Sequence, residues 1–146
     1  MDALKQLTRQ SLWIVLSAVA ALLSGCADMA TSNNVQVKLS GSQEVPPVTT
    51  AGAGSGTITV GADKSVSGSV TITGFAAAAA HIHDGAPGKN GPVIIPLAKT
   101  SDNVWSVAAG AKMTDAQYES FKAGNLYVNV HSAANKGGEV RGQLKP

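Results

Sequence analysis

Cysteine is almost absent from this sequence, and aromatic and charged residues are scarce. The single cysteine, Cys26, excludes a disulfide framework or a thiolate zinc site within the 146-residue chain. Aromatic residues make up 4% of the chain and charged residues 14%, and the formal net charge is only +2. No basic run with interleaved aromatic residues occurs, which argues against a nucleic-acid partner.

The abundant residues indicate a small all-β protein with many turns. Glycine occurs 16 times, and threonine, serine and valine are common. The length suits one domain. Alternating or short apolar runs predict about seven or eight strands. These lie at residues 35–39, 57–60, 65–73, 81–83, 93–97, 103–107, 126–131 and 139–144. Their spacing predicts an antiparallel β-sandwich or a Greek-key barrel with one short helix.

The helix and two irregular pieces are marked by their own residues. The helix is expected after Thr114, whose side chain can cap a free backbone N–H, with Gln117 as its capping-box partner. Gly124 is placed to end the helix. Residues 51–56 are expected to form a flexible glycine-rich turn, and the alanine run at residues 76–80 a helical turn or a loop.

Residues 1–25 are typical of a bacterial lipoprotein signal peptide. Lys5 and Arg9 precede an apolar core at residues 12–22 that is too short for a comfortable membrane span. Residues 23–26, Leu-Ser-Gly-Cys, resemble a lipobox, in which the cysteine is lipidated and becomes the mature N-terminus. We expect a signal peptide at residues 1–25, a lipidated tether at residues 26–34 that begins with Cys26, and a domain at residues 35–146.

Such a chain would be held on a membrane of the cell envelope by its acyl chains. The residue after Cys26 is alanine rather than aspartate. By resemblance to enterobacterial sorting, this favours the outer membrane, with the domain facing the periplasm.

Histidine occurs at only three positions, which fall in two short stretches: His81, His83 and His131. Because side chains alternate between faces in a strand, His81 and His83 share one face, and His131 shares its face with Tyr127 and Asn129. If the two strands are neighbours, three imidazoles meet at one place. Neutral imidazole suits copper and zinc, so the three histidines are the candidate ligands of a transition-metal site.

Four motifs follow one another along the chain. They are residues 39–47 (LSGSQEVPP), residues 81–92 (HIHDG at the start and GP at the end), residues 124–131 (GNLYVNVH) and residues 137–143 (GGEVRGQ). In this order they resemble the CHRD domain, a family named from chordin, over roughly residues 35–144. The resemblance implies a β-sandwich module, frequent in secreted and lipid-anchored bacterial proteins, without an established enzymatic activity.

Several interpretations of the histidine face stay open. In the first, the histidines bind copper or zinc, and Asp84 or Glu139 supplies an extra oxygen ligand or an outer partner. In the second, the histidines join a polar network with Tyr127, Asn129, Glu139 and Arg141 in a structural or adhesive envelope protein that holds no metal. In the third, this face is a patch that binds an envelope protein or polymer.

An enzymatic role has less support in the sequence. The His-x-His pair on a β fold is similar to that of copper–zinc superoxide dismutases, which suggests a small superoxide-handling metalloenzyme. A bridged two-metal site of that kind needs a fourth histidine, which the chain does not have. We therefore expect a lipid-anchored binding module of the envelope rather than an enzyme.

Overall fold

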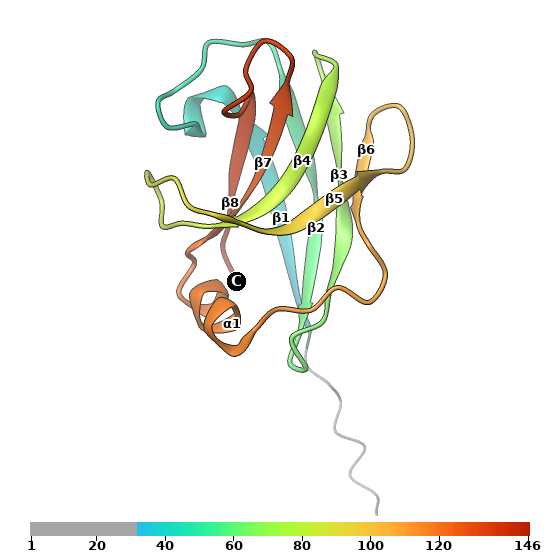
Figure 1. The fold of residues 1–146 in the computed structure, drawn as a ribbon, viewed down its shortest axis with the longest axis vertical. Coiled ribbons are helices and arrows are strands. Elements are labelled where there is room, and N and C mark those ends of the chain that lie inside the picture. The colour runs from blue at the N-terminus through green and yellow to red at the C-terminus, as the bar shows by residue number, and fades with distance from the viewer. Residues whose placement is uncertain (1–31) are drawn as a thin grey trace, which may run out of the picture.

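The alternation of apolar and polar residues produces eight antiparallel strands, which close into a barrel (Figure 1). The structure is a computed structural model that describes residues 32–146. The strands are β1 (Ser32–Ser40), β2 (Ala53–Gly61), β3 (Val66–Thr73), β4 (Ala77–Asp84), β5 (Val93–Lys99), β6 (Val104–Val107), β7 (Leu126–Ser132) and β8 (Val140–Leu144). A short 3-10 helix, η1 (Gly41–Gln43), follows β1, and the helix α1 (Asp115–Lys122) precedes β7. The expected all-β antiparallel fold with one short α-helix is confirmed in its barrel form.

The order of strands around the barrel is β1-β2-β3-β6-β5-β4-β7-β8, with β8 closing on β1. Most neighbours are also consecutive in sequence and form hairpins. Two connections are different: the chain crosses from β3 to β4 without pairing them, and it crosses from β6 through α1 to β7. These two crossings make β4 and β7 direct neighbours, and this pairing positions the histidines.

The core fills the barrel with one face of each strand. On β4, Ala80 and Ile82 are buried, and on β7, Leu126, Val128 and Val130 are fully buried. Burial of each large aliphatic side chain contributes about 1.5–3 kcal/mol, so this interior is the main source of stability. The alternate residues, which include the histidines, are directed away from the apolar core.

Two local expectations were wrong. The alanine run does not form a helical turn or loop, because Ala77–Asp84 is strand β4, and Ala79 and Ala80 pair with β7. The glycine-rich stretch is not a loose turn, because β2 already begins at Ala53 and Gly54 pairs with both β1 and β3. Pairing with neighbouring strands outweighs the local helix preference of alanine and the flexibility of glycine.

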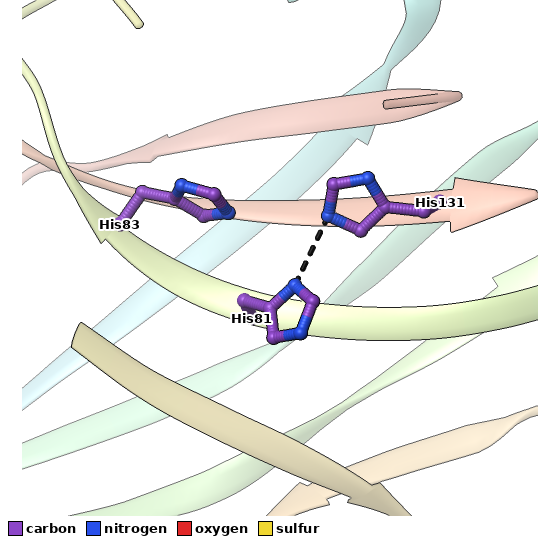
Figure 2. Close-up of side chains that lie close together, drawn as sticks. All are labelled: His81, His83 and His131. Carbon is purple, nitrogen blue, oxygen red and sulfur yellow. Dashed lines mark hydrogen bonds between the residues drawn. The ribbon is translucent and has the colours of Figure 1, made fainter. Parts of the chain in front are cut away.

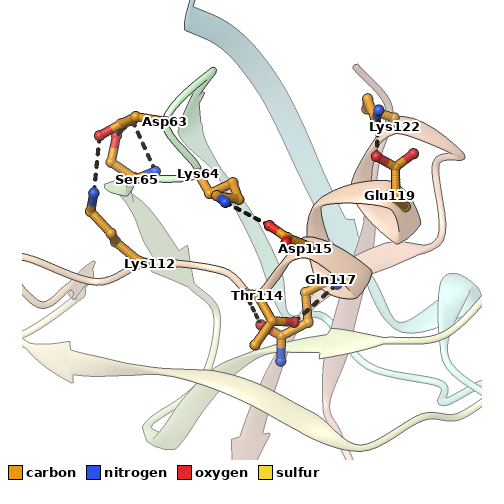
Figure 3. Close-up of polar contacts among 9 residues, drawn as sticks. All are labelled: Asp63, Lys64, Ser65, Lys112, Thr114, Asp115, Gln117, Glu119 and Lys122. Atoms are coloured by element: carbon orange, nitrogen blue, oxygen red, sulfur yellow. Dashed lines mark hydrogen bonds and ion pairs between the residues drawn. The ribbon is translucent and has the colours of Figure 1, made fainter.

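Helix α1 is fixed at its beginning by the predicted capping box (Figure 3). The backbone N–H of Gln117 donates to Thr114 Oγ1 at 3.2 Å, and the N–H of Thr114 donates to Gln117 Oε1 at 2.9 Å. An ion pair of 2.6 Å between Lys64 and Asp115 joins the helix to the β2–β3 turn. Phe121 is fully buried in the core, so the helix is anchored by packing as well as by its cap.

The described residues 32–146 contain no helix that is both long and apolar enough to cross a membrane. The expected signal peptide, most of the tether and Cys26 lie outside the described residues.

Candidate metal centre

Strands β4 and β7 bring the three histidines onto one outer face of the barrel. His83 lies opposite Tyr127, and His81 lies opposite Asn129. His131 lies opposite Ala79, so it is the diagonal neighbour of His81 across the strand pair. The two histidine stretches thus lie on neighbouring, paired strands, which is the condition under which the three imidazoles meet.

The three imidazoles form a compact cluster, hereafter the histidine cluster, which consists of His81, His83 and His131 (Figure 2). One ring nitrogen from each lies within 4.8 Å of the other two. The shortest approach is the hydrogen bond between His81 Nδ1 and His131 Nε2, at 3.1 Å. The ring centroids of His81 and His83 are 5.7 Å apart, and those of His83 and His131 are 6.0 Å apart. His83 is buried, and the other two are partly exposed.

Two backbone carbonyl groups fix which ring nitrogen carries the proton. His83 Nδ1 lies 2.9 Å from the carbonyl oxygen of Gly91, and His131 Nδ1 lies 2.9 Å from that of Lys136. A carbonyl only accepts, so both Nδ1 atoms carry the hydrogen, and each Nε2 has a free lone pair in the neutral ring. His81 Nδ1 is therefore the donor in its bond to His131 Nε2. In metal sites, histidines are oriented in the same way, by a hydrogen bond from the ring nitrogen that does not bind the metal, as His83 and His131 make here to carbonyl groups.

One of these lone pairs has no partner. His83 Nε2 is buried and accepts no hydrogen bond, and Figure 2 shows it directed toward the other two rings. A buried acceptor without a donor costs about 1–3 kcal/mol. The cluster thus contains an unused ligand atom inside the protein, aimed at two other imidazoles.

The pKa values of all three histidines are lowered, with burial as the largest cause at each. At His81, repulsion by the neighbouring imidazolium forms of His131 and His83 adds to the effect. At His83, the hydrogen bond to Gly91 opposes it, while His131 and Arg141 add to it. The cluster is therefore uncharged at neutral pH, which is the form of imidazole that binds metals.

Gly91 and Tyr127 hold His83 in place. The His83 and Tyr127 rings are stacked, with centroids 4.8 Å apart and planes inclined by 14°. The Gly91 N–H donates to the Tyr127 hydroxyl at 3.1 Å, while its carbonyl orients His83. A Cβ atom at Gly91 would lie 1.6 Å from the carbonyl oxygen of Asp84, so only glycine fits here.

The other expected site residues lie around the histidine cluster without joining it. Asp84 and Glu139 are outside the group whose ligand atoms converge. Glu139 instead accepts from Thr50, from Ser132 at 2.7 Å and from Asn135 at 2.5 Å. These bonds hold the pKa of Glu139 below its usual value.

Asn129 and Arg141 are almost fully buried although they face outward from their strands, because loops cover them. Asn129 donates to the Gly137 carbonyl at 3.3 Å, and the Arg141 guanidinium carbon lies 3.5 Å from the centroid of the Tyr127 ring. Within residues 32–146, no ion pair joins Glu139 to Arg141. The polar face therefore contains a network, but His83 and His131 donate to backbone carbonyls rather than to its side chains.

Sequence reasoning missed Gly91 and Lys136, which orient two histidines through carbonyl groups that every residue possesses. It also missed Glu44, a buried carboxyl group beside Arg141. Glu44 precedes Val45 and two prolines in the first of the four motifs, and this placement was the available signal.

The model of the CHRD domain matches residues 35–144. The chain belongs to the CHRD domain family. No curated protein and no solved structure gives a significant match to it. The family covers all eight strands and the whole histidine cluster, apart from the first residues of β1.

Proposed function

We propose that this CHRD-domain protein binds one copper or zinc ion through His81, His83 and His131. The observation that carries the proposal is the convergence of three neutral imidazoles, one of which has a buried Nε2 without any partner. A purely structural network does not account for that unpaired atom.

The spacing of the nitrogens suits a single ion. Two nitrogens bound to a tetrahedral zinc ion at about 2.05 Å lie about 3.3 Å apart. The 3.1 Å between His81 Nδ1 and His131 Nε2 is close to this value, and all three nitrogens lie within 4.8 Å. Three nitrogen ligands without a thiolate favour copper or zinc over magnesium or calcium, which prefer oxygen.

His81 is the residue whose proton must move. Its Nδ1 donates to His131 in the metal-free chain, whereas the other two histidines already carry their proton on Nδ1 and none on Nε2. For Nδ1 of His81 to become a ligand, its proton passes to Nε2, which leaves the ring neutral. Binding at neutral pH therefore needs a tautomer change rather than the loss of a charge.

Titration of the metal-free full-length protein with Cu(II) and with Zn(II), followed calorimetrically, tests the proposal. We expect one site with a Kd below about 1 µM. Replacement of His83 by alanine should weaken binding by roughly 100-fold or more, since loss of an outer partner alone costs 10- to 100-fold. Gln36→Ala, an exposed polar change on β1, is the control and should leave the affinity unchanged. Affinity weaker than micromolar, or equal affinity in the His83 variant, would support the structural network instead.

Binding rather than turnover is the second part of the proposal. The groups in contact with His83 and His131 are the Gly91 and Lys136 carbonyls and the Tyr127 ring, and the Glu139 carboxylate accepts from Thr50, Ser132 and Asn135. No group in this set is placed as a general base. A superoxide assay on the metal-loaded protein checks this point: we expect no rate above that of the free metal ion, and a faster rate would identify a superoxide-handling enzyme.

We also propose that Cys26 is lipidated and that the protein is held on the cell envelope, in the outer membrane and facing the periplasm. The order of a charged segment, an apolar core and Leu-Ser-Gly-Cys supports this proposal. Cys26→Ser should leave an unprocessed precursor and abolish fatty-acid labelling. Normal processing of that variant would contradict the proposal.

A further inference from the structure

Arg141 is a buried cation without a carboxylate partner. It is 1% exposed, and no ion pair involves it among residues 32–146. Its hydrogen bonds go to neutral oxygens, at 3.4 Å to Asn90, 3.2 Å to the Ala86 carbonyl and 3.2 Å to Gln143. Stacking on Tyr127 adds a cation–π contact but no negative charge. Buried charges are normally paired, so this arrangement leaves Arg141 able to accept an anion.

A cavity of about 320 Å³ has Arg141 among the residues that line it, and it is hereafter the arginine cavity. Its wall includes Arg141, Gln143 and Lys145 from β8 and the end of the chain, and Glu44 from the segment after η1. The volume exceeds what a single water needs, about 10–15 Å³ on the same measure, by more than an order of magnitude. A small organic molecule therefore fits.

Glu44 lies in the wall as a carboxyl group that is poorly suited to being charged. It is 5% exposed, and its Oε1 atom has no hydrogen-bond partner. Burial raises the pKa of Glu44 to about 7, with the Glu139 charge adding to the effect and the Arg141 charge opposing it. Asn129 Oδ1 is also buried and unpaired. A Cβ atom on Gly138 would lie 2.5 Å from Asn129 Oδ1 and 2.6 Å from each Glu44 carboxyl oxygen, so these three oxygens converge beside Gly138. Near neutral pH, Glu44 is thus partly a neutral donor and does not neutralise Arg141.

We propose that the arginine cavity binds a small carboxylate ligand, held by the Arg141 guanidinium group, with Lys145 at the rim and the Glu44 carboxyl as a second donor. A planar carboxylate matches the fork of donors on a guanidinium group. A phosphate brings a larger negative charge close to Glu44 and Glu139, so the singly charged carboxylate is the better fit. The site shares no side chain with the histidine cluster and does not depend on a metal.

Acetate is the probe, and the Arg141 side chain reports on it directly. The chain has only one other arginine, Arg9, so the Nε–H region of a ¹⁵N NMR spectrum contains at most two arginine signals. Arg141→Lys assigns the signal by removing it. Acetate added to the metal-free full-length protein should shift the Arg141 signal saturably, at constant ionic strength. Inorganic phosphate is the second arm and should bind roughly tenfold more weakly.

Two further variants sharpen the test. Lys145→Gln, at an exposed position, should weaken acetate binding roughly two- to fivefold, as expected for one charge at a solvated rim. Lys99→Gln on β5, outside the cavity wall, is its matched control and should have no effect.

Because Glu44 must be protonated to donate, acetate should bind about tenfold more weakly at about pH 8 than at about pH 6. Glu44→Gln should remove the pH dependence.

The proposal is overturned if acetate produces no saturable shift, or if chloride at equal concentration produces the same one. It is also overturned if Lys145→Gln and Lys99→Gln change the affinity equally, because the effect would then be one of net charge. Stronger binding of phosphate than of acetate would identify a phosphate ligand and so contradict the proposed carboxylate class.

Discussion

His83 and Glu44 have one property in common: each buries a polar atom, Nε2 and Oε1 respectively, that has no hydrogen-bond partner. Leaving such an atom unpaired typically costs 1–3 kcal/mol, which a folded protein of marginal stability retains only where something offsets it. His83 belongs to the histidine cluster, and Glu44 is one of the residues that line the arginine cavity. A ligand at either site would recover part of that cost.

Gly91→Ala should disturb the histidine cluster, although it substitutes no histidine. The new Cβ would lie 1.6 Å from the Asp84 carbonyl oxygen, so the chain at residue 91 must move away from His83 and Tyr127. We expect a loss of about 1–3 kcal/mol in the free energy of unfolding and a metal affinity weakened roughly 10- to 100-fold. Chemical denaturation and metal titration measure the two effects.

Gly137→Ala is the matched control, because a Cβ there meets nothing within 4 Å. It should change neither quantity by more than about 0.5 kcal/mol. Unchanged metal affinity in Gly91→Ala would show that the carbonyl of Gly91 does not orient the ligand.

Glu44 should make the protein less stable as pH rises. Its pKa in the folded chain, about 7, is above the ordinary value of 4.5, so the folded state binds the extra proton. The stabilisation is present below about pH 4.5 and is lost as the pH rises to about 7. Glu44→Gln should therefore be more stable than the natural chain by about 1–2 kcal/mol at about pH 8 and nearly equal to it at about pH 5. Denaturant melts at both values check the sign, and greater stability of the natural chain at the higher pH would contradict it.

Among the elements, α1 depends most visibly on one local interaction. Thr114→Ala removes the side-chain acceptor of the Gln117 N–H and should cost about 0.5–2 kcal/mol of stability. Ser120→Ala in the same helix, where no side-chain hydrogen bond is formed in the described structure, is the control and should be nearly neutral. Equal thermal shifts in the two variants would mean that the cap contributes nothing.

The helix and the strands also differ in how far the sequence could predict them. The helix cap and the strand faces of His81, His83 and His131 were predictable, because a capping box and a two-residue alternation are local properties. The strand at Ala77–Ala80 was not predictable, because alanine becomes part of a strand there only through pairing with β7. The orientation of two histidines by backbone carbonyls was equally hidden, since it depends on how two loops return to the strands.

At the scale of the whole molecule, closure into a barrel was also beyond local reasoning. A sandwich and a barrel give the same alternation of inward and outward residues along each strand. The difference lies in the contact of β1 with β8, at Ser40 and Arg141, between strands about a hundred residues apart in the chain. The resemblance to the CHRD domain identified the family, but it implied a sandwich.

A bound metal should stabilise the entire barrel, because the histidine cluster joins β4 to β7. With the free ion at about 100 times its Kd, the free energy of unfolding should rise by about 2.7 kcal/mol, and the midpoint of thermal unfolding by several degrees. Thermal melts with Zn(II), before and after addition of a chelator, measure this. His83→Gln should abolish the rise; a rise that persists in that variant would place the ion elsewhere.

Closure of the barrel also determines how these molecules meet one another. An open sheet presents a row of free N–H and C=O groups to which a strand of a second molecule can add, and such additions lead to aggregates. Here β8 is joined to β1, and each strand of residues 32–146 has a neighbour on both sides. The closing pair of β1 with β8 is Ser40 with Arg141, so closure blocks the addition of a second molecule's strand there and not along the rest of β1.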